Sequence, residues 1–109
     1  MNTPFKKTIS FQSQDGWDLV GDLISAKAPD HAILVSAGTG FPRQFYNALA
    51  TYLAANGAAV LIFDYRGIGD SSANDIANTN IQYLDWAKDQ AAAIEALENE
   101  APNLPITHV

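Results

Sequence analysis

Two loops of the chain carry residue types that could do chemistry. The first is the segment 36–43, Ser-Ala-Gly-Thr-Gly-Phe-Pro-Arg, which follows a short apolar run and precedes a predicted helix. In an open α/β sheet, ligands bind at the carboxyl ends of the strands. Glycines there let a backbone N–H approach a substrate oxygen without interference from a Cβ, and such an N–H can stabilise a developing oxyanion. The alternative is a tight strand-to-helix turn that binds no ligand, because glycine-rich turns are common.

The second loop is the segment 64–72, Asp-Tyr-Arg-Gly-Ile-Gly-Asp-Ser-Ser. Asp64 and Arg66 can each form several hydrogen bonds and could lock the loop. Gly67 and Gly69 permit sharp turns of the backbone. We interpret this segment as a structural loop beside a site rather than as the site itself.

A serine nucleophile is not predicted in either loop. The segment 69–73 superficially matches a Gly-x-Ser-x-small elbow, but an elbow needs a strand, one sharp turn and a helix that starts at once. Ser72 instead follows the apolar run ending at Phe63 only after a long polar stretch. His31 precedes a predicted strand and His108 lies inside one, so neither is placed as a catalytic base. We therefore expect no catalytic residue in this chain.

Metal and nucleotide sites are also not predicted. The chain has no cysteine and no cluster of histidines and carboxylates at ligand spacing, so we expect no metal and no cofactor. The Gly-x-Gly pairs at 38–40 and 67–69 both lack the third glycine of a dinucleotide fingerprint. Nucleotide binding is kept as a minor alternative, which a titration with NAD or ATP would test through tryptophan fluorescence.

Composition narrows the class of partner. The 109 residues carry a net charge of −6, which argues against binding to nucleic acid or to anionic membranes. Hydrophobic residues make up 48% of the chain, enough for a core. The first ten residues contain no signal-peptide core, and no run reaches the roughly 18 apolar residues of a membrane span. We predict a cytoplasmic protein.

The hydrophobic pattern predicts alternating strands and helices. Strands are expected at 8–11 and 17–24, which form a hairpin, and at 32–35, 58–63 and 106–109. Helices are expected at about 44–56, ended by Gly57, and at about 81–100. This order is typical of a parallel sheet with right-handed crossovers.

Each predicted helix has an apolar stripe that is expected to face the sheet. The first stripe consists of Phe45, Ala48, Leu49, Tyr52 and Leu53. The second consists of Leu84, Ala87, Ala91 and Ile94, with Leu97 close beside them.

The chain resembles the N-terminal half of the αβ-hydrolase superfamily, and most closely the bacterial predicted hydrolases of the serine aminopeptidase-like (S33) group. Four segments carry the resemblance: 15–16, 37–46, 63–71, and 83–86 with Asp89. The third is the most specific, because the turn Asp-x-Arg-Gly-x-Gly-x-Ser after the fourth strand recurs throughout the superfamily.

The resemblance implies a partial αβ-hydrolase fold in the α/β class: an N-terminal β-hairpin followed by parallel βαβαβ, with helices on both faces of the sheet. Residues 1–109 are then the N-terminal portion of one domain. In the family, the first glycine loop supplies an oxyanion-hole N–H, which carries over to Gly38 and Thr39. Asp64, Arg66, Gly67, Gly69 and Ser71 would form a structural loop near the site. The complete protein would hydrolyse an ester, amide or related acyl bond of a small molecule.

The resemblance also implies that this chain lacks the catalytic triad. The segment 105–109 matches the family strand that precedes Gly-His-Ser-x-Gly-Gly, so the nucleophile is expected about three residues beyond Val109. The acid and the histidine come later in the family. Because the three residues act as a unit, we expect this chain to be inactive.

The alternative hypothesis is a small non-catalytic α/β module that binds a ligand or partner. Its difficulty is the last predicted strand, which would be central in the family's complete sheet and here is expected at an edge. An edge strand exposes unpaired backbone groups, so self-association through this strand is expected.

Overall fold

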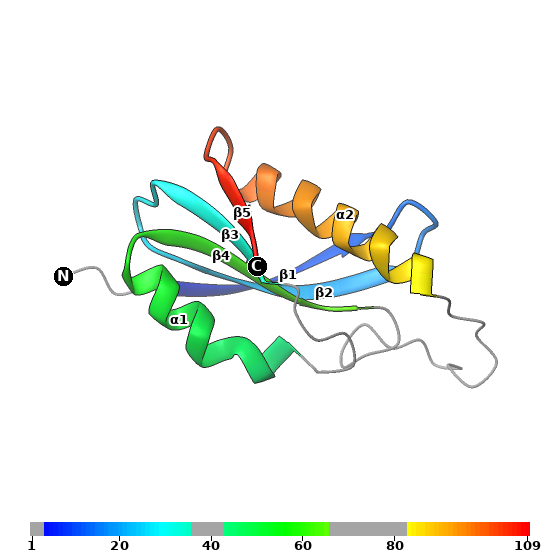
Figure 1. Ribbon diagram of the computed structural model, residues 1–109, viewed down its shortest axis with the longest axis horizontal. Coiled ribbons are helices and arrows are strands. Elements are labelled where there is room, and N and C mark those ends of the chain that lie inside the picture. Colours follow the sequence, from blue (N-terminus) through cyan, green and yellow to red (C-terminus); the bar gives the residue numbers. More distant parts are fainter. Residues whose placement is uncertain (1–3, 36–42, 66–82) are drawn as a thin grey trace.

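The computed structural model describes residues 4–35, 43–65 and 83–109, and the side chains of 83–86 are not included in that description. The described residues form a five-stranded mixed sheet with a helix on each face (Figure 1). The elements are β1 (Phe5–Gln12), β2 (Asp18–Ser25), β3 (His31–Val35), the 3₁₀ turn η1 (Arg43–Tyr46), α1 (Asn47–Ala55), β4 (Ala58–Asp64), α2 (Tyr83–Glu100) and β5 (Ile106–His108). The predicted fold class is confirmed.

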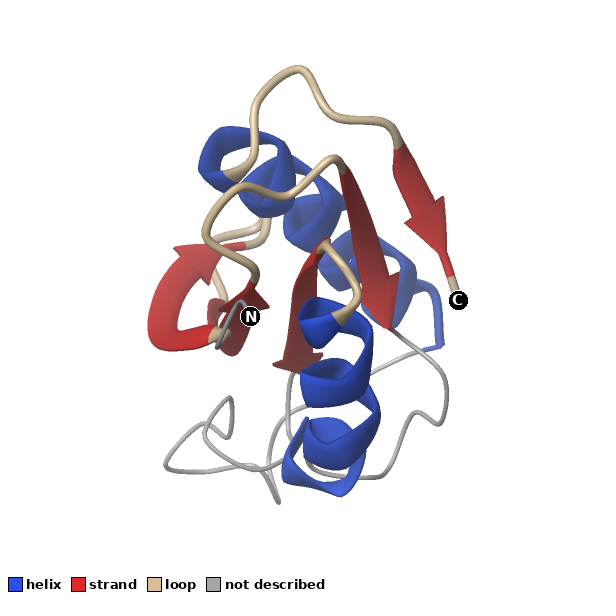
Figure 2. Cartoon of the chain, turned by 90° about the vertical axis from the view of Figure 1, so that its left-hand side faces the viewer, coloured by secondary structure: helices blue, strands red, loops and turns tan. Residues whose placement is uncertain are grey.

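The strand order is β1-β2-β4-β3-β5. β1 and β2 form the predicted antiparallel hairpin, with Gly16 at a positive φ of 88° in the turn. β2 pairs antiparallel with β4, whereas β3 runs parallel to both β4 and β5. Figure 2 shows the hairpin at one side of the sheet and the C-terminal strand at the other. The sheet is therefore mixed, with its parallel part built around β3.

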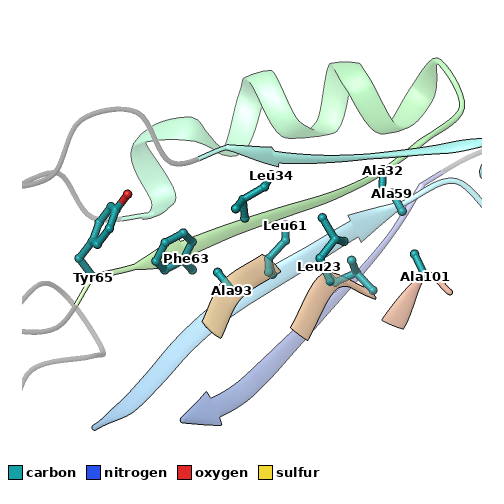
Figure 3. Close-up of a cluster of buried hydrophobic side chains, with 10 residues drawn as sticks. Leu23, Ala32, Leu34, Ala59, Leu61, Phe63, Tyr65, Ala93 and Ala101 are labelled. Carbon is teal, nitrogen blue, oxygen red and sulfur yellow. The ribbon is translucent and has the colours of Figure 1, made fainter. Parts of the chain in front are cut away.

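Two hydrophobic clusters, one on each face of the sheet, form the core. Side chains alternate between the faces along each strand, and all seven residues of β4 are buried. The cluster beneath α2 contains Leu23, Leu34, Leu61, Phe63, Ala93, Leu97 and Ala101, among others (Figure 3). The cluster beneath α1 contains Ile24, Ile33, Val35, Val60, Ile62, Ala50 and Ala54, among others. Both faces of the central strands are thus covered.

The buried face of α1 differs from the prediction. Phe45, Leu49 and Tyr52 are 66%, 43% and 67% exposed, whereas Ala50 and Ala54 are fully buried. Within the predicted stripe, Leu53 is the residue that packs partly against the core. The prediction was wrong because α1 has no charged side chain to mark its outer face, and because small alanines let the helix approach the sheet closely. The α-helix also begins only at Asn47, after the 3₁₀ turn.

The buried face of α2 is displaced from the predicted stripe as well. Ala92, Ala93 and Leu97 are buried together with the carboxylate of Asp89, whereas Ala87 and Ala91 are exposed. Ile94 is half-buried against the core, and the side chain of Leu84 lies outside the description. The polar Asp89 occupies the inward face, so a stripe drawn through apolar residues alone missed it.

The end of α1 follows the prediction. Gly57 has a positive φ of 98°, and its N–H donates a hydrogen bond of 3.1 Å to the Ala54 carbonyl. No helix in the described ranges is long and apolar enough to cross a membrane.

Candidate functional site

The two glycine-containing loops leave the same edge of the sheet. β3 ends at Val35 and β4 ends at Asp64, and the two parallel strands are paired, with Val35 opposite Ile62. In α/β sheets this carboxyl edge is where ligands bind. The structure thus brings together the strand ends from which both loops start.

Most of the predicted site residues lie outside the described residues. These are the oxyanion candidates Gly38 and Thr39, and the loop residues Arg66, Gly67, Gly69 and Ser71. Their roles stay predictions. Asp64 is described, and the geometry around it defines the site that the structure shows.

Asp64 binds Arg43 through both carboxylate oxygens. It is fully buried at the end of β4. The backbone N–H of Arg43 donates to Oδ1 at 2.6 Å, and its Nη1 donates to Oδ2 at 2.6 Å. Asp64 therefore fixes the start of η1, which follows the first loop, in addition to ending the strand that leads into the second.

Arg43 also binds a second buried carboxylate, that of Asp22 in β2. Its Nε donates to Asp22 Oδ2 at 2.9 Å, and the other oxygen of Asp22 accepts a hydrogen bond of 2.8 Å from Thr8 Oγ1. Lys6 Nζ lies 3.7 Å from Asp22 Oδ2 at the edge of the group. We call these five residues, Lys6, Thr8, Asp22, Arg43 and Asp64, the Arg43 cluster.

The pleat of the sheet explains why the cluster assembles on the face covered by α1. Residues two apart in a strand share a face. Asp22 therefore points to the same side as Ile24, and Asp64 to the same side as Ile62, and both of these isoleucines pack beneath α1. Thr8 lies directly opposite Asp22 in the hairpin. Arg43, in the 3₁₀ turn just before α1, binds these side chains on the same face of the sheet.

The negative and positive charges of the Arg43 cluster are equal in number. Two carboxylates face one guanidinium and one partly exposed ammonium group. Burying such charges is costly, and it is tolerated when their hydrogen-bonding groups are satisfied. Among the described residues, no buried side-chain nitrogen or oxygen lacks a partner. The cluster is thus a rigid ionic joint, and carboxylates held this firmly by cations are poor candidates for a nucleophile or a base.

Asp22 and Arg43 were missed as site residues in the sequence. The available signal was the type of residue: Asp22 lies between the apolar pairs 19–20 and 23–24 of its strand, and a buried charge in such a position requires a partner. The partner could not be named, because Arg43 lies 21 residues away.

A second polar contact ties α2 to the end of β4. Tyr65 is buried with its ring 4.7 Å from that of Phe63, and Gln90 Nε2 donates to Tyr65 Oη at 3.0 Å. The neighbouring Asp89 is fully buried. The segment 83–89, which contributed to the family resemblance, therefore begins a helix that is anchored at the same edge of the sheet.

The described histidines lie apart from this joint. His31 begins β3 and contacts Asp30, and His108 is exposed on β5. No group of three or more histidine, aspartate and glutamate residues within the described ranges is arranged to hold a metal ion.

The sequence matches one protein-family model, described as serine aminopeptidase, S33, over residues 27–109. The match includes both glycine-containing loops and the segment 83–89. A search of curated proteins found no match.

Solved structures of αβ-hydrolases and esterases share the fold. An alpha/beta hydrolase, GrgF from Penicillium sp. sh18, is 24% identical with a TM-score of 0.75, over 94% of this chain and 34% of its own. A hypothetical protein from Pseudomonas aeruginosa is 21% identical with a TM-score of 0.80, over 97% and 35%. A thermostable carboxyl esterase from Bacillus coagulans is 22% identical with a TM-score of 0.78, over 94% and 35%. The chain spans about a third of the length of these three proteins.

Proposed function

Because the chain belongs to the serine aminopeptidase S33 family of αβ-hydrolases, we propose that residues 1–109 are the N-terminal portion of a hydrolase domain. The complete domain cleaves an ester, amide or related acyl bond of a small molecule. The observation that carries this proposal is the family match, which runs through both loops, 36–42 and 64–72, that follow the paired strands β3 and β4 in the sequence.

In this proposal the two loops have different tasks. The backbone N–H groups of Gly38 and Thr39 bind the oxyanion that forms when the carbonyl carbon is attacked. Asp64, Arg66, Gly67, Gly69 and Ser71 shape a structural loop beside it. The bonds between Asp64 and Arg43 support a structural role for Asp64, because they join the start of the second loop to the end of the first.

The 109-residue chain by itself is proposed to be inactive. It contains no Gly-x-Ser-x-Gly elbow. The nucleophile, the acid and the histidine act as a unit, so oxyanion donors alone retain only a small part of the rate. We expect no covalent labelling by a fluorophosphonate, measured by intact-mass spectrometry. Labelling at Ser71 or Ser72 would contradict the proposal.

The activity of the complete domain is tested on a longer chain. The coding sequence after Val109 is read, and an in-frame continuation is expressed and assayed with p-nitrophenyl esters of short and long acyl groups. We expect hydrolysis that is lost when the serine of the continued elbow is changed to alanine. A continuation that folds but hydrolyses neither esters nor amides would overturn the proposed activity.

A second candidate function is a non-catalytic interaction module. One observation favours it, the exposure of Leu49 and Tyr52 on α1, whereas β5, which pairs with β3 alone in the described sheet, is its difficulty. We propose that an isolated chain self-associates through the free edge of β5. Sedimentation velocity over a range of concentrations tests this. A dilute monomer with a sharp two-state melt would exclude self-association as a requirement for folding and would favour the module.

The expected lack of nucleic-acid and membrane partners stays a prediction, as does the cytoplasmic location. Fractionation of cells that express a tagged chain tests the location.

A further inference from the structure

β1 forms one edge of the sheet, at the side opposite β5 (Figure 2). Within the described residues it pairs with β2 alone. We propose that this edge binds the same edge of a second copy of the chain, so that two β1 strands pair antiparallel about a two-fold axis and join two sheets into one. This contact is separate from the one proposed for β5, and it does not depend on the hydrolytic activity proposed above.

The register of the hairpin decides which backbone groups of β1 point outward. The N–H of Ser13 donates to the Trp17 carbonyl at 3.0 Å, which makes these two residues a hydrogen-bonded pair just beyond the strands. Bonded and non-bonded pairs alternate along an antiparallel ladder. The residues of β1 whose N–H and C=O groups point away from β2 are therefore Lys6, Thr8, Ser10 and Gln12. A row of outward groups on an edge strand is a template for another strand.

One register of two antiparallel β1 strands pairs all of these outward residues with one another. It sets Ile9 opposite Ile9 of the second copy. Lys6 then faces Gln12, and Thr8 faces Ser10. A shift by two residues in either direction leaves one outward residue opposite a position outside β1, and a shift by one sets outward groups against inward ones. The backbone thus favours a single alignment.

The side chains on the α2 face fit this alignment. Ile9 and Phe11 are only half-buried in a single chain, although Phe11 packs edge-on against the ring of Phe63. Beside them, between β1 and α2, lies a hollow of about 380 Å³ that Ala96 also lines. In the paired arrangement the second copy brings its own Ile9 and Phe11 to this edge. Pairing therefore removes the remaining apolar surface of both residues from water.

The lysines of β1 do not oppose the pairing. Lysines on an edge strand usually keep other strands away. Here Lys6 and Lys7 each lie against an acid of their own chain, at 3.7 Å and 2.6 Å, and the register sets neither of them opposite a lysine. Lys7 of the second copy instead lies opposite Phe11, which shares a small hollow with Glu95. Among the described residues Glu95 has no ion pair, so its carboxylate can attract that lysine.

The test is disulfide cross-linking, which is specific because the chain has no cysteine of its own. Ile9→Cys sets two thiols opposite each other in a non-bonded pair with Cα atoms about 4.5 Å apart, within disulfide range. The matched control is Ser10→Cys, whose two copies lie about 8 Å apart across the axis, beyond that range. With diamide as the oxidant, we expect Ile9→Cys to form covalent dimers at least about tenfold faster than Ser10→Cys on non-reducing gels. Equal rates would overturn the inference.

A second substitution connects the cross-link to the backbone edge. Ser10→Pro removes an outward N–H and no bond to β2, a position at which edge strands tolerate proline. We expect Ile9→Cys combined with Ser10→Pro to keep the circular dichroism spectrum of Ile9→Cys and to cross-link at least about tenfold more slowly. Undiminished cross-linking in the folded double variant would overturn the inference.

The unmodified chain gives an independent measurement if a variant does not fold. Amide exchange is followed by NMR at two protein concentrations about a hundredfold apart. We expect the outward N–H groups of β1 to exchange about tenfold more slowly at the higher concentration, because the monomer fraction of a nearly saturated dimer falls as the square root of concentration. Exchange in β1 that does not depend on concentration would overturn the inference. Slowing confined to β5 would also overturn it and would locate self-association at the other edge.

Discussion

The two helices cover opposite faces of one sheet in different ways. α2 buries Leu97 and Ala93 and carries charged side chains such as Glu95 and Glu98 on its outer face. α1 has no charged residue, buries little more than two alanines, and exposes its larger apolar side chains. α2 is therefore held by the volume of the side chains it buries. α1 is held by the close approach of its buried alanines to the sheet and by the Arg43 cluster next to its N-terminal end. Hydrophobicity alone does not identify the buried face of such a helix.

The largest effect is expected on the α2 face. Leu97→Ala removes a fully buried side chain and leaves a cavity against Leu34 and Leu61. We expect a loss of about 2–4 kcal/mol in the free energy of unfolding, measured by urea titration. Glu98→Gln, on the exposed side of the same helix, serves as the control and should change stability by less than about 0.5 kcal/mol. Similar values for the two variants would show that α2 is not held by its buried volume.

An intermediate effect is expected on the α1 face, where space is the limiting factor. Ala54→Leu adds volume at a fully buried position between the helix and the sheet. We expect a loss of about 1–3 kcal/mol, because the helix must shift away from the strands. Ala55→Leu places the same side chain at the adjacent exposed position and should change stability by about 0.5 kcal/mol or less. A higher free energy of unfolding in Ala54→Leu would show that the contact between α1 and the sheet leaves unfilled space at this position.

The smallest effect is expected on the outer side of α1. Leu49→Gln exchanges an exposed leucine for a polar residue of similar length, and the free energy of unfolding should change by no more than about 0.5 kcal/mol. Leu53→Gln, at the partly buried position of the same helix, should cost more. A loss above about 1 kcal/mol in Leu49→Gln would show that this surface is covered in solution, and the difference between the two helices would disappear.

The sheet could be predicted from the sequence because its central strands have an unambiguous pattern. Short apolar runs such as 58–63 fit strands covered on both faces. Gly16 and Gly57 marked turns that need positive φ, and the structure confirms both. The local chemistry of these segments is sufficient to define them.

The helix faces could not be predicted in the same way. α1 is apolar nearly all round, so its pattern contains no contrast between inside and outside. On α2, the inward-facing Asp89 broke the apolar periodicity. In both helices the contact with the sheet determines which face is buried. The sequence of the helix alone does not specify that contact.

The candidate site could be predicted only in part. Asp64 lies at the carboxyl edge, as expected from its place after a buried strand. Its bonds to Arg43 join residues 21 positions apart, and the role of Asp22 depends on the pairing of β2 with β4. The sequence specified neither. The roles of Gly38 and Thr39 stay predictions.

The Arg43 cluster also has a consequence for how the chain reaches its native state. Arg43 lies 21 residues from Asp22 and 21 residues from Asp64, so three distant segments must meet before the charges are neutralised. A slip of β2 by one residue against β4 would turn Asp22 to the other face and leave the guanidinium without one partner. The carboxylate of Asp22 would then be a buried charge without its partner Arg43, which is costly. The cluster therefore favours the native alignment of β2 and β4. This matters most in a folding step that is slow because distant segments must first come together.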